Sequence, residues 1–224
     1  IARLQKGEVH FYNLDGDEIQ KDLTEIKWDA EAAEKGGFEH FMMKEIHEQP
    51  KAVKDTISSV VKDGRIDFSN LEMTPEEIQN YSQIHIVACG SAYHVGVTTQ
   101  YVMEDLAKIP VRTDLASEFR YRKPLLGKND LVIVISQSGE TADTLAALRE
   151  AKAKGVKTLA IVNVVGSSIA READHVFYTL AGPEISVATT KAYSTQLIAG
   201  YLLAIEFAKV RGEITDEKYN ALLE

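Results

Sequence analysis

The chain has 224 residues, 45% hydrophobic and 26% charged, which is the composition of an ordinary globular protein and not of a disordered, collagenous or coiled-coil one. Its 25 basic and 34 acidic residues give a net charge of −9, which argues against binding nucleic acid or an anionic membrane. The single cysteine, Cys89, excludes an internal disulfide and indicates a reducing, cytoplasmic environment. The longest apolar stretch, residues 197–208, is shorter than the roughly 20 residues that span a bilayer.

The first 50 residues differ from the rest of the chain. They carry 6 basic and 12 acidic residues, a net charge of −6, which leaves −3 for the remainder. Because the sequence opens with Ile1 and not with Met, and runs at once into strand-like residues, we expect a piece of a longer protein. Residues 1–20 predict a hairpin around the turn sequence DGD at 15–17. The polar stretch that follows, with Pro50 as its stop, is typical of a connector between domains.

After Pro50, short apolar runs alternate with helical stretches. Residues 131–135 are apolar at every position, as expected of a strand covered on both faces. Between the strands, apolar residues recur at helical spacing. This repetition predicts an α/β fold with a doubly wound, mostly parallel sheet. The predicted strands are residues 84–89, 111–115, 131–135, 158–162 and 175–180.

The last predicted helix covers residues 190–211. It is apolar on almost every side between Leu197 and Ala208. A helix of this kind is buried, either in the centre of its own chain or against a second subunit or domain. We therefore expect it to mediate self-association.

Three polar loops are predicted beyond the carboxyl ends of the strands, where ligands bind in an open parallel sheet. They are residues 89–93 (CGSAY), 136–141 (SQSGET) and 186–191 (SVATTK). In the second loop, amide groups at a helix start, backed by the helix dipole, and the neighbouring hydroxyls are suited to bind phosphate without a cation. The alternative is simple N-capping by Ser136 or Ser138.

Other kinds of site find less support in the sequence. No P-loop motif is present, and the dinucleotide-binding pattern fails because Gly90 is followed by Ala92 and Val95 at the positions that need glycine. Cys89 ends a predicted buried strand, which favours a structural role over that of a nucleophile. The six histidines form no pair with metal-ligand spacing.

Two charged residues flank the loops. Glu140 lies where the helix dipole favours a carboxylate, and we expect it to accept hydrogen bonds from free amides. Lys191 lies near a helix start, where a cation is disfavoured unless an anion or a carboxylate meets it. Its two interpretations are contact with a bound anion and pairing with Glu184, and the sequence does not decide between them.

Residues 136–145, which follow a hydrophobic strand, closely resemble a sugar isomerase (SIS) domain. More narrowly, the chain resembles the isomerizing glutamine:fructose-6-phosphate aminotransferase family over nearly its whole length. Residues 44–50 (KEIHEQP) match the family's connector, 116–122 (ASEFRYR) a family helix, and 187–196 the opening of the last helix. The resemblance implies a flavodoxin-like, three-layer α/β/α fold.

The resemblance also implies a division of the chain. Residues 1–25 would end a glutaminase domain, 26–50 would form a linker, 51–211 the first of two SIS domains, and 212–224 the start of a connector to the second. The family's catalytic residues lie in the other domains. No catalytic residue is therefore expected here, and the chain should bind without catalysing.

The family reaction takes ammonia from glutamine and converts fructose 6-phosphate to glucosamine 6-phosphate, without a metal or organic cofactor. A homodimer is implied, together with contacts to the glutaminase domain and the second SIS domain. The implied phosphate ligands are Ser136, Gln137, Ser138 and Thr141, and the implied sugar contacts are Cys89, Gly90, Ser91, Val187 and Thr189.

The chain departs from the family pattern at two loops. Ser91 and Ala92 stand where the family usually has threonine and serine, so one hydroxyl is lost, and Thr189 replaces the usual serine. Two alternative functions stay open. One is a non-catalytic SIS-type sensor, although the acidic first 50 residues do not resemble a DNA-binding module; the other is a structural module whose loops only cap helices.

Overall fold

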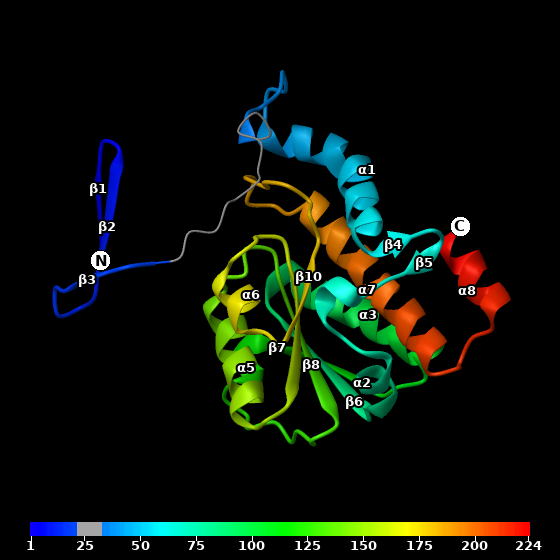
Figure 1. Ribbon diagram of the computed structural model, residues 1–224. Helices are drawn as coiled ribbons and strands as arrows, with labels where there is room; N and C mark the ends of the chain where they lie inside the picture. The colour runs from blue at the N-terminus through cyan, green and yellow to red at the C-terminus, as the bar shows by residue number, and fades with distance from the viewer. Residues whose placement is uncertain (22–32) are drawn as a thin grey trace.

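The computed structural model describes residues 1–21 and 33–224, and the five predicted parallel strands all form (Figure 1). They hydrogen-bond in the order β10-β9-β8-β6-β7, all parallel. In this sheet β6 comes first along the chain, and β7 is then added at one edge. The chain next returns to place β8 on the other side of β6. This reversal creates a switch point between β6 and β8, where ligands bind in open α/β sheets. The strands are β6 (Gln83–Ala88), β7 (Val111–Leu115), β8 (Asp130–Ser136), β9 (Lys157–Val162) and β10 (His175–Tyr178).

Helices cover both faces of this sheet, which confirms the doubly wound α/β prediction. Strand β8 shows why: Ile133 faces one apolar cluster, with α3 and α7, while Val132 and Val134 face another, with α4 and α5. Every residue of β8 is buried. The helices concerned are α3 (Gly90–Ala107) and α7 (Lys191–Val210) on one face, and α4 (Ala116–Phe119), α5 (Ala142–Ala153) and α6 (Ser168–Glu172) on the other.

Helix α7 lies in the interior, as its apolar sequence predicts. Leu203 and Phe207 are completely buried, and α1 (Phe41–Val60) and α3 pack against the helix. The chain's own helices bury much of this helix, and the expected association of two chains through it stays a prediction. The remaining elements of this body are β4 (Val61–Lys62), β5 (Arg65–Ile66), η2 (Ser69–Leu71), α2 (Pro75–Asn80) and α8 (Asp216–Leu223).

Helix α1 runs through Pro50, so the predicted stop at this proline is wrong. A proline inside a helix removes one amide donor and leaves the carbonyl four residues earlier without its usual partner. Here that carbonyl belongs to Ile46, and the side-chain amide of Gln49 donates to it at 3.1 Å. The predicted linker boundary at residue 50 therefore falls inside a continuous helix that packs on α7.

The first residues form a small antiparallel sheet of three strands, where the sequence predicted a two-stranded hairpin. The predicted turn at 15–17 joins β2 to β3, and a second turn at Gly7, with φ of +86°, joins β1 to β2. Part of the predicted linker, residues 26–32, and the end of the predicted glutaminase remnant, residues 22–25, lie outside the described residues. The strands are β1 (Ala2–Gln5), β2 (Glu8–Tyr12) and β3 (Glu18–Ile19).

Candidate functional site

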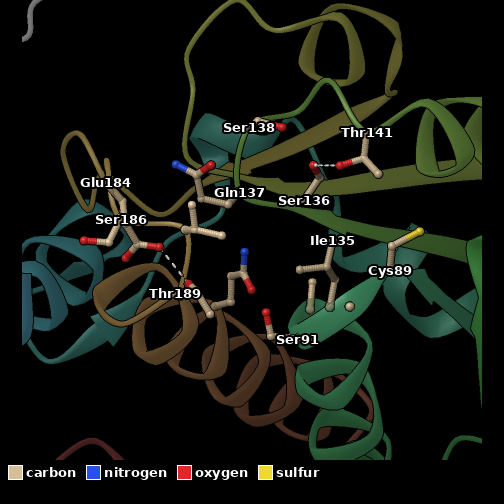
Figure 2. A pocket seen from close by; sticks show the side chains of 14 residues that line it. Cys89, Ser91, Ile135, Ser136, Gln137, Ser138, Thr141, Glu184, Ser186 and Thr189 are labelled. Atoms are coloured by element: carbon tan, nitrogen blue, oxygen red, sulfur yellow. Dashed lines mark hydrogen bonds between the residues drawn. The ribbon is translucent and has the colours of Figure 1, made fainter. Parts of the chain in front are cut away.

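A cavity of about 320 Å³ opens at the carboxyl ends of β6 and β8, at the switch point of the sheet (Figure 2). All three predicted loops contribute to it. All nine residues predicted to bind substrate line its wall, although they come from segments about 50 residues apart in sequence. The lining residues are Cys89, Gly90, Ser91, Ala92, Ile135, Ser136, Gln137, Ser138, Thr141, Glu184, Ser186, Val187, Thr189 and Gln196.

The second loop is held by its own hydroxyl groups. The amide of Gly139 donates to Ser136 Oγ at 3.0 Å, and the amide of Glu140 donates to Ser138 Oγ at 3.2 Å. Ser136 Oγ also lies 3.0 Å from Thr141 Oγ1, a hydrogen bond drawn in Figure 2. Both serine hydroxyls accept from amides of the turn itself and neither caps the first turn of α5, so the N-capping alternative is wrong.

Gly139 gives this loop its tight geometry. Its φ is +67°, in the left-handed region that disfavours side chains, and a Cβ atom here would lie 2.0 Å from Ser167 Oγ. The carbonyl of Gly139 accepts a hydrogen bond from Ile169, in α6, at 3.0 Å. Only glycine therefore fits between the loop and the start of α6.

Helix α5 begins directly after this loop, with Thr141 as its N-cap residue. The Thr141 hydroxyl pairs with Ser136 and makes no capping bond to α5. The amides at a helix start have no partner four residues earlier and carry the positive end of the helix dipole. The Ser138 hydroxyl, the amide of Gln137 and whichever hydroxyl of the Ser136–Thr141 pair does not donate to the other add further donors. Together these groups can donate hydrogen bonds to an anion without carrying a formal positive charge.

The first loop places the start of α3 at the opposite side of the cavity. Cys89 is the N-cap residue of α3, and Gly90 has a φ of +57°. The Thr144 hydroxyl of α5 donates a hydrogen bond to Cys89 Sγ at 3.8 Å. Figure 2 shows that the sulfur is directed away from Ser91. The Cys89 thiol thus takes a packing role, as predicted, while Ser91 is exposed at the helix start.

The third loop is organised by Glu184. Its carboxylate accepts hydrogen bonds from the Thr189 hydroxyl at 2.7 Å and from the amides of Thr190 and Ala192 at 3.2 and 2.9 Å. These bonds cap the start of α7, so three helix N-termini surround one cavity. Because the Thr189 hydroxyl donates its hydrogen to Glu184, its oxygen is left to accept from a ligand. Val187 is fully exposed at the rim.

A carboxylate meets Lys191, as its place at a helix start requires, but that carboxylate is not Glu184. The ammonium group of Lys191, almost completely buried, pairs with Glu48 of α1 at 2.7 Å, and it neither pairs with Glu184 nor lines the cavity. The charge of a cation at a helix start is thereby balanced by a carboxylate that sequence spacing could not identify. In the described part of the chain, the cavity wall holds no lysine, arginine or histidine.

Glu140 has the predicted role, but for a different helix. Its Oε1 accepts a hydrogen bond from the amide of Ser168, the first residue of α6, at 2.7 Å. This bond holds the pKa of the Glu140 carboxyl below its ordinary value. The carboxylate thus joins the second loop to α6.

Three polar lining residues were given no ligand contact from the sequence. Ser186 lies in the predicted third loop, Glu184 precedes that loop, and Gln196 lies in the second turn of α7 and is 4% exposed. The signal for Gln196 was present: it is a polar residue directly before the long apolar stretch of a buried helix, and buried polar groups need hydrogen-bond partners.

Within residues 1–21 and 33–224, no group of three or more His, Cys, Asp or Glu side chains is placed to hold a metal ion. Among the same residues, no helix has the length and hydropathy of a membrane span. Tyr93 and His94, beside the first loop, pack edge to face with each other at 5.4 Å and do not line the cavity.

Comparison with known proteins identifies the family. Residues 77–206 match the SIS domain model. A protein of Caldanaerobacter subterraneus named glutamine--fructose-6-phosphate aminotransferase [isomerizing] is 58% identical over 97% of this chain and 36% of its own length. A protein of the same name from Methanosarcina mazei is 49% identical over 96% of the chain and 35% of its own length. The chain thus spans about a third of these relatives.

A solved structure agrees with the sequence relatives. The C-terminal domain of glucosamine-fructose-6-phosphate aminotransferase from Francisella tularensis superposes with a TM-score of 0.82 at 42% identity, over 85% of this chain and 54% of that one. A phosphosugar isomerase structure from Clostridium difficile, described as putative in its title, gives a TM-score of 0.68 at 28% identity, over 80% and 49%. The chain belongs to the SIS-domain family.

Proposed function

We propose that this SIS-domain chain is the fructose 6-phosphate-binding part of an enzyme that makes glucosamine 6-phosphate and glutamate from fructose 6-phosphate and glutamine. The names of its relatives support this activity, since those at 49–58% identity are called isomerizing glutamine--fructose-6-phosphate aminotransferases. The observation that carries the proposal is the cavity itself: three loops distant in sequence converge there, with hydroxyls, amides and three helix N-termini.

The proposed binding mode divides the cavity into two ends. The phosphate group lies on the second loop, against Ser136, Gln137, Ser138 and Thr141 and the start of α5. The sugar lies between the first and third loops, against Cys89, Gly90, Ser91, Val187 and Thr189. The side chain of Ala92 offers the sugar no hydrogen bond, unlike the hydroxyl usual there in the family.

The cavity binds but does not catalyse. Glu184 is the carboxylate of its wall, and it already accepts hydrogen bonds from one hydroxyl and two amides, which leaves it poorly suited to move a proton. The groups that open the sugar ring and transfer ammonia are assigned to other parts of the whole enzyme, including a glutaminase domain and a second SIS domain. We place the enzyme in the cytoplasm, in keeping with a single free cysteine.

The division of the chain stays a proposal, with one change. We assign residues 1–25 to the glutaminase domain, 212–224 to the connector, and the intervening SIS body to residues up to 211. Because α1 packs on α7, the linker ends and the body begins at Phe41 and not at residue 51. We also propose a homodimer; a chain that stays monomeric in sedimentation at high concentration would contradict this.

Titration calorimetry with fructose 6-phosphate tests the proposed function. Ser138→Ala removes one hydroxyl from the phosphate end, and we expect affinity to fall by about 1.5 to 3 kcal/mol, the scale of one hydrogen bond to a charged group. Ser58→Ala, at an exposed position of α1, is the matched control and should bind like the parent chain. Equal affinity of the Ser138 variant and the control would refute the assignment.

A further inference from the structure

One buried carboxylate connects helix α1 to the cavity. Glu45 is 2% exposed, and its Oε1 accepts hydrogen bonds from the amides of Ile185 at 2.6 Å and Ser186 at 3.1 Å. Ser186 lines the cavity and lies directly before Val187. A buried carboxylate is costly unless hydrogen bonds compensate its lost hydration, so this pair of bonds has a structural purpose.

The same side of α1 bonds to the start of α7. Glu48 pairs with Lys191 at 2.7 Å, and Gln49 Oε1 accepts a hydrogen bond from Ser194 Oγ at 2.5 Å. Residues three and four positions after Glu45 share its side of the helix. Helix α1 lies alongside α7 in Figure 1, so its polar contacts bind it to both the third loop and the helix that follows.

Glu45 and Glu184 hold different parts of the third loop. Glu184 fixes residues 189–192 from within the loop, whereas Glu45 fixes residues 185–186 from a separate helix. Val187 lies between the two anchored parts, at the rim of the cavity. Loss of the Glu45 anchor would therefore free one end of the segment that carries the proposed sugar contacts.

Among the described residues, no hydrogen bond joins the second loop directly to α1. Its hydrogen bonds run among its own hydroxyls, to the start of α6 through Gly139 and Glu140, and to the amide of Asn163, which donates to the Gln137 carbonyl at 3.1 Å. Helix α1 also lies outside residues 77–206, the part of the chain that matches the SIS domain model. The two ends of the cavity are thus supported by different elements.

We propose that Glu45 is a positioning residue that lets helix α1 set the sugar end of the cavity without affecting its phosphate end. The proposal rests on the proposed function for its ligand. Its physical content is that the Glu45 carboxylate holds the Ile185 and Ser186 amides, and thereby places Val187 for contact with the sugar. A shift of Glu45 away from these two amides would then change sugar recognition more than phosphate recognition.

The test compares two ligands and two variants in the full chain. Affinities for fructose 6-phosphate and for inorganic phosphate are measured for the parent, Glu45→Gln and Glu45→Ala, with Glu48→Gln as a control on the same side of α1. We expect Glu45→Ala to weaken fructose 6-phosphate binding at least about tenfold, the scale of a lost charged hydrogen bond, with phosphate binding changed less than about twofold. Glu45→Gln keeps an acceptor oxygen, so its affinity for fructose 6-phosphate should lie between those of the parent and Glu45→Ala.

Amide hydrogen exchange gives a readout that does not need a ligand. In both Glu45 variants the amides of Ile185 and Ser186 should exchange faster, whereas in Glu48→Gln they should exchange as in the parent. Glu48→Gln should lower stability but leave the ratio of the two affinities unchanged.

The outcomes separate this inference from the proposed function. If the parent chain does not bind fructose 6-phosphate, the proposed function fails, while exchange at Ile185 and Ser186 still tests the anchor. If the parent binds and Glu45→Ala retains its affinity, or loses both ligands to the same degree, the positioning role is overturned. Unchanged exchange at the two amides would overturn it as well.

Discussion

Replacing Gly139 by alanine tests whether the second loop needs its backbone geometry. The left-handed conformation, with φ of +67°, costs a non-glycine residue about 1 to 2 kcal/mol. The added Cβ would lie 2.0 Å from Ser167 Oγ and 2.5 Å from Ser167 Cβ, and relief of such overpacking costs about 1 to 3 kcal/mol. We therefore expect Gly139→Ala to lower the free energy of unfolding by about 2 to 5 kcal/mol.

Gly155 provides a matched control for this substitution. It has a φ of +72°, but a Cβ atom at this position meets nothing within 4 Å. Gly155→Ala should therefore show the conformational cost alone, about 1 to 2 kcal/mol. Urea unfolding measures both variants, and titration with fructose 6-phosphate should show weakened binding for Gly139→Ala only. A Gly139 variant as stable as the Gly155 variant would refute the reasoning.

Three further predictions concern charge and helix continuity. The pKa of Glu140 is lowered in the folded chain, first by the hydrogen bond from the Ser168 amide. The ionised carboxylate therefore stabilises the fold above the pKa that Glu140 has in the unfolded chain, and this stabilisation is lost as the pH falls through its pKa in the folded chain. Glu140→Gln should thus make stability depend less on pH at the acid end of a stability–pH profile. Pro50→Ala should raise the free energy of unfolding, measured by urea unfolding, by about 1 to 3 kcal/mol, because alanine is the more favourable residue inside a helix. A decrease would contradict the helical position of Pro50. Glu48→Gln leaves the buried Lys191 without its anion and should lower the free energy of unfolding by about 1.5 to 3 kcal/mol, the scale of a hydrogen bond between charged groups at a partly exposed carboxylate. An unchanged stability would contradict the ion pair.

The sheet and the phosphate loop could be predicted because their signals are local. Residues 131–135 are apolar at every position, which indicates a strand covered on both faces, and a hydroxyl-rich loop follows at once. Parallel strands then bring such loops to one edge of the sheet. Hence the convergence of Ser136, Ser91 and Thr189 on one cavity follows from periodicity and topology.

The contacts of α1 could not be predicted, because they depend on residues far apart in sequence. Pro50 predicts a helix stop by its local chemistry, and only the Gln49 side chain and packing on α7 override it. The partner of Lys191 is 143 residues away, and the amides bonded to Glu45 are about 140 away. No spacing rule within the sequence identifies such pairs.

A crystal structure of the chain with fructose 6-phosphate tests the central claim most directly. The account predicts phosphate oxygens on the amides and hydroxyls of residues 136–141 and the start of α5, with no lysine or arginine side chain from the described residues within hydrogen-bond distance. A phosphate group bound to a cationic side chain elsewhere, with the cavity at β6 and β8 empty of sugar, would contradict it.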